Sequence, residues 1–149
     1  MTVTVLSATR NHGAFIDAAI ESVRAQTHAD WRLHVLDDGS TDDTVARVEA
    51  WCARDARITL HRAPSPPSGP LGAYLQLLAL APRGHDVALL DGDDAWLPTH
   101  LERSLAALAE ATPTLVHGDL ALIDADARVL APSLWQAAGL DPRPATLRR

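Results

Sequence analysis

Short apolar, β-branched runs alternate with segments of helical periodicity along most of the chain, and this alternation limits the possible folds more than any other feature. The strand-like runs are 2–8, 31–38, 57–62 and 85–91, and the helix-like segments are 13–26, 40–55, 73–81 and 99–111. Such an alternation predicts an α/β fold, in which helices cover both faces of a mostly parallel sheet. The crossovers between its strands should be right-handed.

Four local patterns refine the boundaries of these elements. Ser40 and Asp43 have the spacing of a capping box at the start of the second helix. The segment 63–72 is dense in Pro and Gly, which predicts a loop. The run 85–91 is apolar enough to be a strand that is buried on both faces. The segment 114–130 predicts two short strands around a turn at its "DADA" sequence.

Composition and charge exclude several classes of protein. A chain of 149 residues is long enough for one domain, and its net charge of -6 lacks the basic footprint that nucleic-acid binding requires. No apolar run approaches the roughly 20 residues of a membrane-spanning helix, and the start has no signal-peptide pattern. Cys52 is the single cysteine, which excludes an intrachain disulfide. We therefore expect a cytoplasmic domain with no integral membrane segment and no nucleic-acid partner.

Acidic side chains gather where the predicted strands end. Asp37 and Asp38 follow the second strand, and the "DGDD" sequence at 91–94 follows the fourth. The carboxyl ends of parallel strands share one edge of a sheet, which is where ligands bind in such folds. The D-x-D pair of Asp91 and Asp93 offers the hard oxygen ligands that Mg²⁺ or Mn²⁺ prefers. Because such an ion is held by one or two carboxylates plus substrate phosphates, the pattern predicts a metal-dependent site for a phosphate-bearing ligand.

Other interpretations of these acids stay open at this point. The "DGDD" sequence could be a solvated turn, with Asp94 or Thr99 capping the next helix. The acids after the second strand could belong to a strand end, a turn at Gly39 and a capped helix, although this does not account for two adjacent carboxylates. Paired acids at strand ends also mark Mg²⁺-binding receiver domains. In those domains the pair follows the first strand, whereas here it follows the second.

The order of the motifs resembles that of a known family. The sequence "TVLSATRNHGAFIDAAIESVRAQTHADWRLHVLDDGSTDDT" is similar to the start of family 2, GT-A-type glycosyltransferases, whose first helix ends S-V-x-x-Q-T and whose second strand leads into D-D-G-S-T-D-x-T. Ser22, Val23, Gln26 and Thr27 match that helix end. "LLDGDDAWLPTHLE" matches the family's D-x-D-D stretch, and "LVHGDLALIDADARVL" resembles the segment that follows. The chain is therefore identified as a member of this family.

The resemblance implies a Rossmann-like GT-A fold, a three-layer sandwich with a mostly parallel central sheet, that binds a nucleotide-diphosphate sugar. A UDP-linked donor is one candidate. The implied nucleotide-sugar-binding residues are Thr9, Asn11, Asp37, Asp38, Asp91, Gly92 and Asp93. Thr9 and the Asp37/Asp38 pair would lie by the nucleoside, and Asp91 by the ribose. Asp91 and Asp93 are the implied metal ligands, with Asp93 on a Mn²⁺ or Mg²⁺ ion that neutralises the departing diphosphate.

The sequence departs from the family pattern at several positions. Ala8 replaces the family's Pro, and Arg10 replaces its Tyr. Leu75 and Gln76 stand where the family has the Arg and Asn of an A-R-N motif. A cationic contact to the donor is therefore expected to be missing.

The C-terminal part offers no general base by motif. We expect residues 1–131 to form the domain that binds the nucleotide-diphosphate sugar, followed by a weakly patterned tail, 132–149, in which the family's acidic acceptor and base segment is missing. Asp119, Asp124 and Asp141 are acids in this half of the chain, but no motif singles out one of them. The predicted function is metal-dependent sugar transfer to an unknown acceptor. The alternative is a truncated or non-catalytic nucleotide-binding remnant.

Three smaller features complete the picture. Trp96, beside the acid cluster, is suited either to stack on a sugar or to pack under the loop. His117 is expected to be a pocket or surface residue rather than a metal ligand. Cys52 has no neighbouring histidine motif, which favours a buried and inert thiol.

Overall fold

The first part of the chain folds as a parallel sheet between helices. The computed structural model describes residues 1–64, 66–110 and 115–140, and its contacts divide the chain into two units, Met1–Ala106 and Ala107–Arg149. The first unit holds a four-stranded parallel sheet of order β3-β2-β1-β4. The strands are β1 (Val3–Thr9), β2 (Trp31–Asp37), β3 (Ile58–Arg62) and β4 (Asp86–Leu89). The helices are α1 (Ile16–Arg24), α2 (Thr44–Cys52), α3 (Gly69–Leu80) and α4 (His100–Glu110), whose last residues belong to the second unit.

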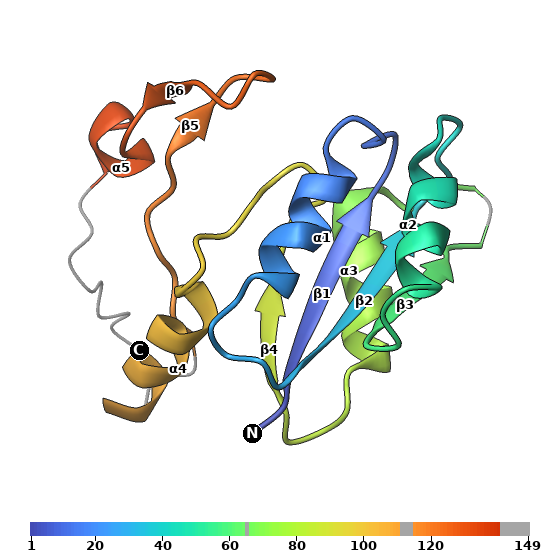
Figure 1. Cartoon of the computed structure of the whole chain (residues 1–149), viewed down its shortest axis with the longest axis horizontal. Coiled ribbons are helices and arrows are strands. Elements are labelled where there is room, and N and C mark those ends of the chain that lie inside the picture. Colours follow the sequence, from blue (N-terminus) through green and yellow to red (C-terminus); the bar gives the residue numbers. More distant parts are fainter. Residues whose placement is uncertain (65, 111–114, 141–149) are drawn as a thin grey trace. The chain divides into compact units, whose positions relative to one another are not determined.

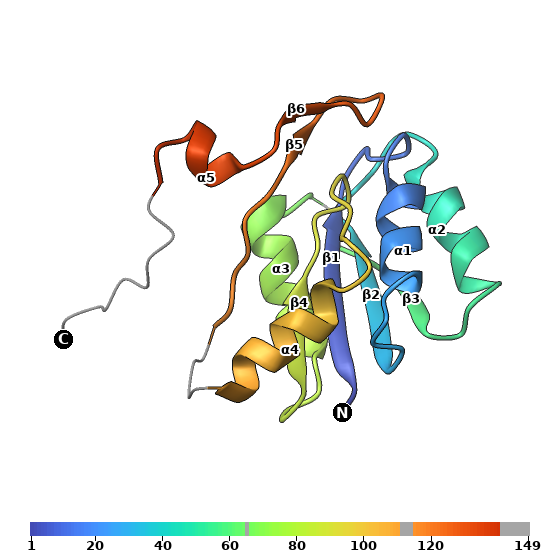
Figure 2. The same cartoon turned by 60° about the vertical axis from the view of Figure 1, so that its left-hand side comes forward.

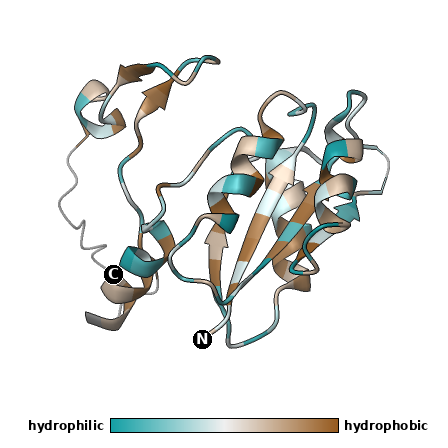
Figure 3. Ribbon diagram, viewed as in Figure 1, coloured by the Kyte–Doolittle hydropathy of each residue, from teal (hydrophilic) through white to brown (hydrophobic). Residues whose placement is uncertain are grey.

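Helices cover both faces of this sheet, which confirms the predicted α/β fold. α1 and α2 lie in front of the sheet in Figure 1 and α3 lies behind it, and the turned view in Figure 2 separates the same three layers. Val5 of β1 and Leu33 of β2 belong to the core cluster that includes buried residues of α1 and α2, whereas Leu6 packs with Leu77 of α3. The two-residue period of the strands sends neighbours to opposite faces, and the strands accordingly carry much of the apolar sequence, brown in Figure 3.

The strand β4 is more exposed than its sequence suggests. Val87 and Leu89 are 39% and 55% exposed, so the prediction that the run 85–91 is buried on both faces is wrong. The reason is its place in the sheet, since β4 pairs with β1 on one side and with no other strand of the described residues. Apolar composition alone does not separate a central strand from an edge strand.

The helix α3 begins four residues before the predicted position. The last four residues of the segment 63–72, which was predicted as a loop, are helical, because α3 starts at Gly69. Pro70 lies in the first two helical positions, where its missing N–H would have no partner within the helix. The density of Pro and Gly therefore marks a helix start here rather than a continuous loop.

The predicted capping box at the start of α2 is absent. Asp43 occupies the N-cap position without a side-chain capping bond, and the Ser40 hydroxyl accepts from the backbone N–H of Asn11 instead. Asp42 supplies the missing acceptor, since its carboxylate takes the backbone N–H of Thr44 at 3.0 Å. It also accepts the N–H of Gly13 at 3.0 Å, which ties the start of α2 to the loop after β1.

The second unit contains the two short strands predicted around "DADA". They are β5 (Leu122–Ile123) and β6 (Val129–Ala131), they pair antiparallel, and a short helix, α5 (Leu134–Ala137), follows. Residue 114, the predicted start of this segment, lies outside the described residues. The functional division into 1–131 and 132–149 stays a prediction. In the described residues no helix is long and apolar enough to cross a membrane.

Candidate functional site

A pocket of about 430 Å³ lies where the strands β1, β2 and β4 end. Thr9, Asp38, Asp91 and Asp93, four of the residues predicted for the site, line it. Arg10 lines it as well, so the pocket has a cation although the family's A-R-N arginine is replaced. The structure therefore brings the acids of two distant sequence motifs to one cavity, at the sheet edge where α/β folds bind ligands.

Asp38 fixes the start of α3. Its side chain is 3% exposed, and it accepts the backbone N–H of Ser68 at 2.8 Å, the Ser68 hydroxyl at 2.9 Å and the N–H of Gly69 at 2.7 Å. Burial acts to raise the pKa of Asp38, but these hydrogen bonds and the nearby charge of Arg10 outweigh it, so the pKa lies below its usual value. A charged Asp38 at a helix N-terminus is electrostatically favourable.

Asp37 serves the turn that follows β2 and does not line the pocket. Its carboxylate accepts the N–H of Gly39 at 3.2 Å and that of Ser40 at 3.1 Å. Gly39 has a φ of 85°, a conformation that favours glycine. The turn interpretation of this motif is therefore correct for Asp37, and the adjacent acid has a separate partner in α3.

Asn11 braces the loops after β1 and β2 and also lies outside the pocket lining. Its backbone is left-handed, with a φ of 57°, as asparagine tolerates better than most residues. Its N–H donates to the Ser40 hydroxyl at 2.9 Å, and its side-chain oxygen accepts the N–H of Thr41 at 2.8 Å. These bonds hold the two loops in register at the pocket's rim.

Asp91 is held by a residue that the sequence did not single out. The Tyr74 hydroxyl, from α3, lies 2.5 Å from Asp91 Oδ1 and 3.1 Å from the Leu90 carbonyl oxygen. Burial, the hydrogen bond to Asp91 and the Asp91 charge raise the pKa of Tyr74. In the sequence Tyr74 is one apolar-type residue of a helical segment, and no local signal assigns it to the site.

Asp91 and Asp93 of the "DGDD" sequence share the pocket with Arg10, but the described residues show no ion pair between them and this arginine. Within residues 1–64, 66–110 and 115–140, no ion pair includes Asp91, Asp93 or Asp94. Partial burial raises the pKa of Asp94, and the charges of Asp91 and Asp93 raise it further. No group of three or more potential metal ligands occurs in the same residues. Asp91 and Asp93 are the carboxylates of this sequence that line the pocket, and they could hold an ion whose coordination the phosphates of a substrate complete.

Gly92 lets this acidic turn lie directly against the end of β1. A Cβ atom at position 92 would be 2.7 Å from Thr9 Oγ1 and 2.7 Å from His12 Nδ1, closer than real contacts allow. Both of these polar atoms are buried, and neither has a hydrogen-bond partner in the described part of the chain. Gly92 is not in the pocket lining, so its role in the structure is to permit this close approach.

Gln26 and Thr27, which follow α1, hold the segment 97–101 in place after the "DGDD" turn. Gln26, 6% exposed, donates to the Leu97 carbonyl at 2.8 Å and accepts the N–H of Leu101 at 2.9 Å. The N–H of Thr27 donates to the Pro98 carbonyl at 2.9 Å. The end of α1 therefore fixes both the exit from the "DGDD" turn and the start of α4.

Trp96 lies between the acids and this clamp. It packs against the main core cluster and stacks on His100 with a centroid distance of 4.5 Å. These contacts support the packing interpretation of Trp96. Cys52 is only partly buried, and that burial raises the pKa of its thiol, as expected for an inert cysteine.

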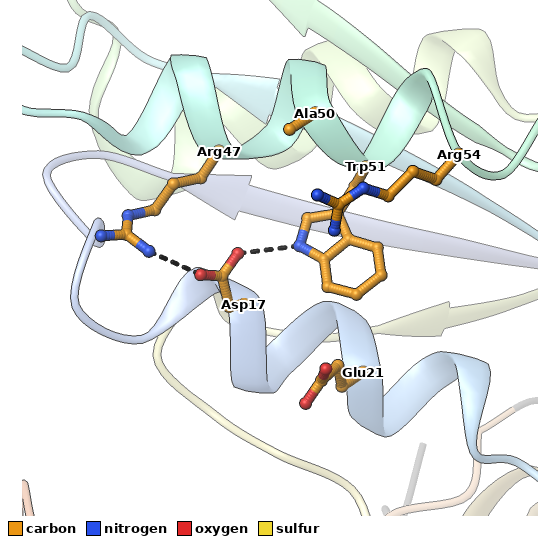
Figure 4. A pocket seen from close by; sticks show the side chains of 6 residues that line it. All are labelled: Asp17, Glu21, Arg47, Ala50, Trp51 and Arg54. Carbon is orange, nitrogen blue, oxygen red and sulfur yellow. Dashed lines mark hydrogen bonds and ion pairs between the residues drawn. The ribbon is translucent and has the colours of Figure 1, made fainter.

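A second hollow, of about 370 Å³, lies between α1 and α2. Figure 4 shows the Asp17 carboxylate between two partners, the Trp51 indole N–H at 2.8 Å and Arg47 at 2.6 Å. These contacts tie the two helices together. No acid of the two motifs borders this hollow, so the pocket at the strand ends is the candidate site.

The acids considered as general bases are engaged locally. Asp119 accepts the N–H of Leu120 at 2.8 Å and that of Trp135 at 3.1 Å, and a hydrogen bond from Ser133 is the main cause of its lowered pKa. Asp124 accepts the N–H of Asp126 within the "DADA" sequence and that of Arg128 directly after it. Asp141 lies outside the described residues. Neither of the two described candidates therefore gains support from the structure as a general base.

Comparisons with known proteins bear on the family and the fold of this chain. A relative in Escherichia coli, the UDP-Glc:alpha-D-GlcNAc-diphosphoundecaprenol beta-1,3-glucosyltransferase WfgD, is 32% identical over 82% of this chain and 47% of its own length. The chain spans less than half the length of the curated relatives that it matches. The structure of S. aureus TarS in complex with UDP-GlcNAc has a TM-score of 0.65 at 24% identity, over 74% of this chain and 32% of that one. This likeness confirms the GT-A fold.

A second solved structure is the mannosyltransferase PcManGT from Pyrobaculum calidifontis in complex with GDP-Man and Mn²⁺. It matches with a TM-score of 0.58 at 26% identity, over 63% of this chain and 28% of that one. The sequence model described as Glycosyl transferase family 2 matches residues 4–143, nearly the whole chain. On this match, the chain belongs to glycosyl transferase family 2.

Proposed function

We propose that this domain binds a nucleotide-diphosphate sugar in the pocket at the strand ends and serves in the transfer of that sugar, with a divalent ion at Asp91 and Asp93. The observation that carries the proposal is the acid pair in the lining of the pocket, which forms no ion pair within the described residues. Two carboxylates of one turn repel each other, and a divalent ion with a diphosphate would offset this repulsion. The names of relatives support this class of donor, since one uses UDP-Glc and others are bound to UDP-GlcNAc or to GDP-Man with Mn²⁺.

The residues of the pocket divide the proposed work between them. Asp93, which has no protein partner among the described residues, would hold Mn²⁺ or Mg²⁺, and the ion would supply charge neutralisation for the departing diphosphate. Asp38 Oδ2 takes one hydrogen bond, from Gly69, and retains capacity for another from a base N–H. Thr9 lines the pocket at the end of β1, and its buried Oγ1 has no partner in the described residues. Asp91 would accept a hydrogen bond from the ribose.

Calorimetric titration of the whole chain tests the proposal. UDP, GDP and dTDP are added with and without Mn²⁺, and we expect metal-dependent binding of at least one of them. Asp93→Asn should weaken that binding by about tenfold or more, because it removes a charged metal ligand and retains the shape. Asp126→Asn, at an exposed turn of the second unit, is the matched control and should bind as the parent does.

The outcomes separate the candidate functions. Failure of every nucleotide to bind in the presence of the metal, or equal binding by Asp93→Asn, overturns the proposed site. Binding without transfer or hydrolysis of the matching nucleotide sugar supports the alternative, a nucleotide-binding remnant. That alternative draws on one observation, the local engagement of Asp119 and Asp124 by turn N–H groups.

A further inference from the structure

We infer that Tyr74 is a positioning residue for the donor, and that it holds one oxygen of Asp91 so that the other is presented to a ribose hydroxyl. This inference rests on the proposed function, because it requires a nucleotide in the pocket. It adds a residue that the family pattern does not carry. Tyr74 stands where that pattern has the Ala of A-R-N, next to the replaced Arg position at Leu75.

Contacts of α3 before and after Tyr74 fix the position of the phenol. Asp38 binds the start of α3 through Ser68 and Gly69, and the Gln76 amide donates to the Ser68 hydroxyl at 3.0 Å. Further along, Ala73 and Leu77 are buried against Leu6 of β1. The helix that carries Tyr74 is therefore anchored to the sheet on each side of this residue, and its hydroxyl meets Asp91 Oδ1 at 2.5 Å.

The hydroxyl can serve only one of its two neighbours at a time. It has a single proton, and the Asp91 carboxylate is a stronger acceptor than the Leu90 carbonyl because it is charged. An ordinary tyrosine phenol loses its proton only at about pH 10, so the Tyr74 hydroxyl is a donor at neutral pH. Tyr74 is thus a permanent donor to Oδ1, and the hydrogen bond limits rotation of the carboxylate.

A carboxylate held in this way offers its second oxygen in one direction. Both Tyr74 and Asp91 line the pocket, and no other hydrogen bond in the described residues uses the Asp91 side chain. The free oxygen has two lone pairs, so it can accept a hydrogen bond from a ribose hydroxyl and still contact the ion, without first losing rotational freedom. In a variant that lacks the phenol hydroxyl, Asp91 would have to be ordered by the ligand itself.

Discrimination between ribose and deoxyribose tests this role. Affinities are measured by calorimetry, with Mn²⁺, for the nucleoside diphosphate that the parent binds best and for its 2′-deoxy and 3′-deoxy analogues. The parent should prefer the ribonucleotide over one analogue by about tenfold, the size of one hydrogen bond to a charged group. Tyr74→Phe should reduce this preference to about twofold, and Leu78→Ala, on the exposed side of α3, should retain it.

The ratio of the affinity for the ribonucleotide to that for its deoxy analogue separates a positioning role of Tyr74 from a general structural effect. A merely structural role would lower the melting temperature or all three affinities together and leave the ratio unchanged, and that result would overturn the inference. In an Asp91→Ala background, Tyr74→Phe should have no further effect on the ratio, because the two residues act as one unit. A parent that binds nucleotides without any preference for ribose refutes this inference and leaves the proposed function intact. A parent that binds no nucleotide refutes both.

Discussion

The replacement Gln26→Leu probes the clamp between α1 and the segment that follows the "DGDD" turn. Gln26 is 6% exposed and makes three hydrogen bonds, to the Ser22 carbonyl at 3.0 Å, the Leu97 carbonyl at 2.8 Å and the Leu101 N–H at 2.9 Å. Leucine has a similar volume but no polar atoms. The variant therefore removes the bonds and creates little cavity.

The loss of the Leu101 bond should dominate the cost. Leu101 is 1% exposed and its N–H lies in the first turn of α4, where helical N–H groups have no partner within the helix. Leaving a buried donor unpaired costs about 1–3 kcal/mol. Leu97 is 75% exposed, so water can replace the bond to its carbonyl, and the Ser22 carbonyl belongs to α1. We expect a total loss of about 2 kcal/mol in the free energy of unfolding.

Urea denaturation followed by tryptophan fluorescence measures this loss, since four tryptophans report on the fold. Gln76→Leu is the matched control. In the described residues the Gln76 side-chain amide makes one hydrogen bond, which is exposed, so its loss should change stability by less than about 0.5 kcal/mol. A loss of the same small size for Gln26→Leu would refute the argument that Gln26 caps α4 and fixes the acidic loop.

Three further predictions concern the pocket and the sheet. Gly92→Ala should displace the acidic turn from Thr9 and destabilise the fold by about 1–3 kcal/mol. It should also abolish metal-dependent nucleotide binding in calorimetry. Retained binding would contradict the argument from the close approach of Gly92 to Thr9. Burial lowers the pKa values of His34 and His61, so the unfolded chain binds more protons below about pH 6.5. Stability should be full above that pH and fall as the pH drops toward the folded-state values, and a double change to Gln should flatten this profile in urea melts. Asp38→Asn places amide protons against main-chain donors and should lower stability by about 2 kcal/mol, measured by thermal unfolding.

The order of elements could be predicted because its signals are local. β1 is buried along its whole length, and the apolar run 2–8 announces it. The helix starts were harder, since Pro70 is equally compatible with a loop and with a first helical turn. The exposure of β4 depends on which strands pair with it, and no local pattern reports that.

The contacts that build the site are the part that local patterns could not supply. The sequence identifies Gln26 as a motif residue, but its partners Leu97 and Leu101 lie 71 and 75 positions away. Tyr74 reaches Asp91 only because α3 packs on β1 and β2 and so lies close to the residues that follow β4. In the sequence it is one more helix residue, because hydrogen bonds between distant segments leave no periodic trace.

The two acid motifs look alike in the sequence and differ in how their charge is balanced. Asp37 and Asp38 are 5% and 3% exposed, and N–H and hydroxyl donors of neighbouring segments satisfy both carboxylates. These two acids therefore need no ion. Among the described residues, Asp93 has neither a hydrogen-bond donor nor an ion-pair partner, and Asp91 has only the Tyr74 hydroxyl. A divalent ion lowers the free energy most where negative charge is least compensated. We therefore expect the proposed metal at the end of β4, and the end of β2 is left for the neutral, hydrogen-bonding part of the proposed ligand.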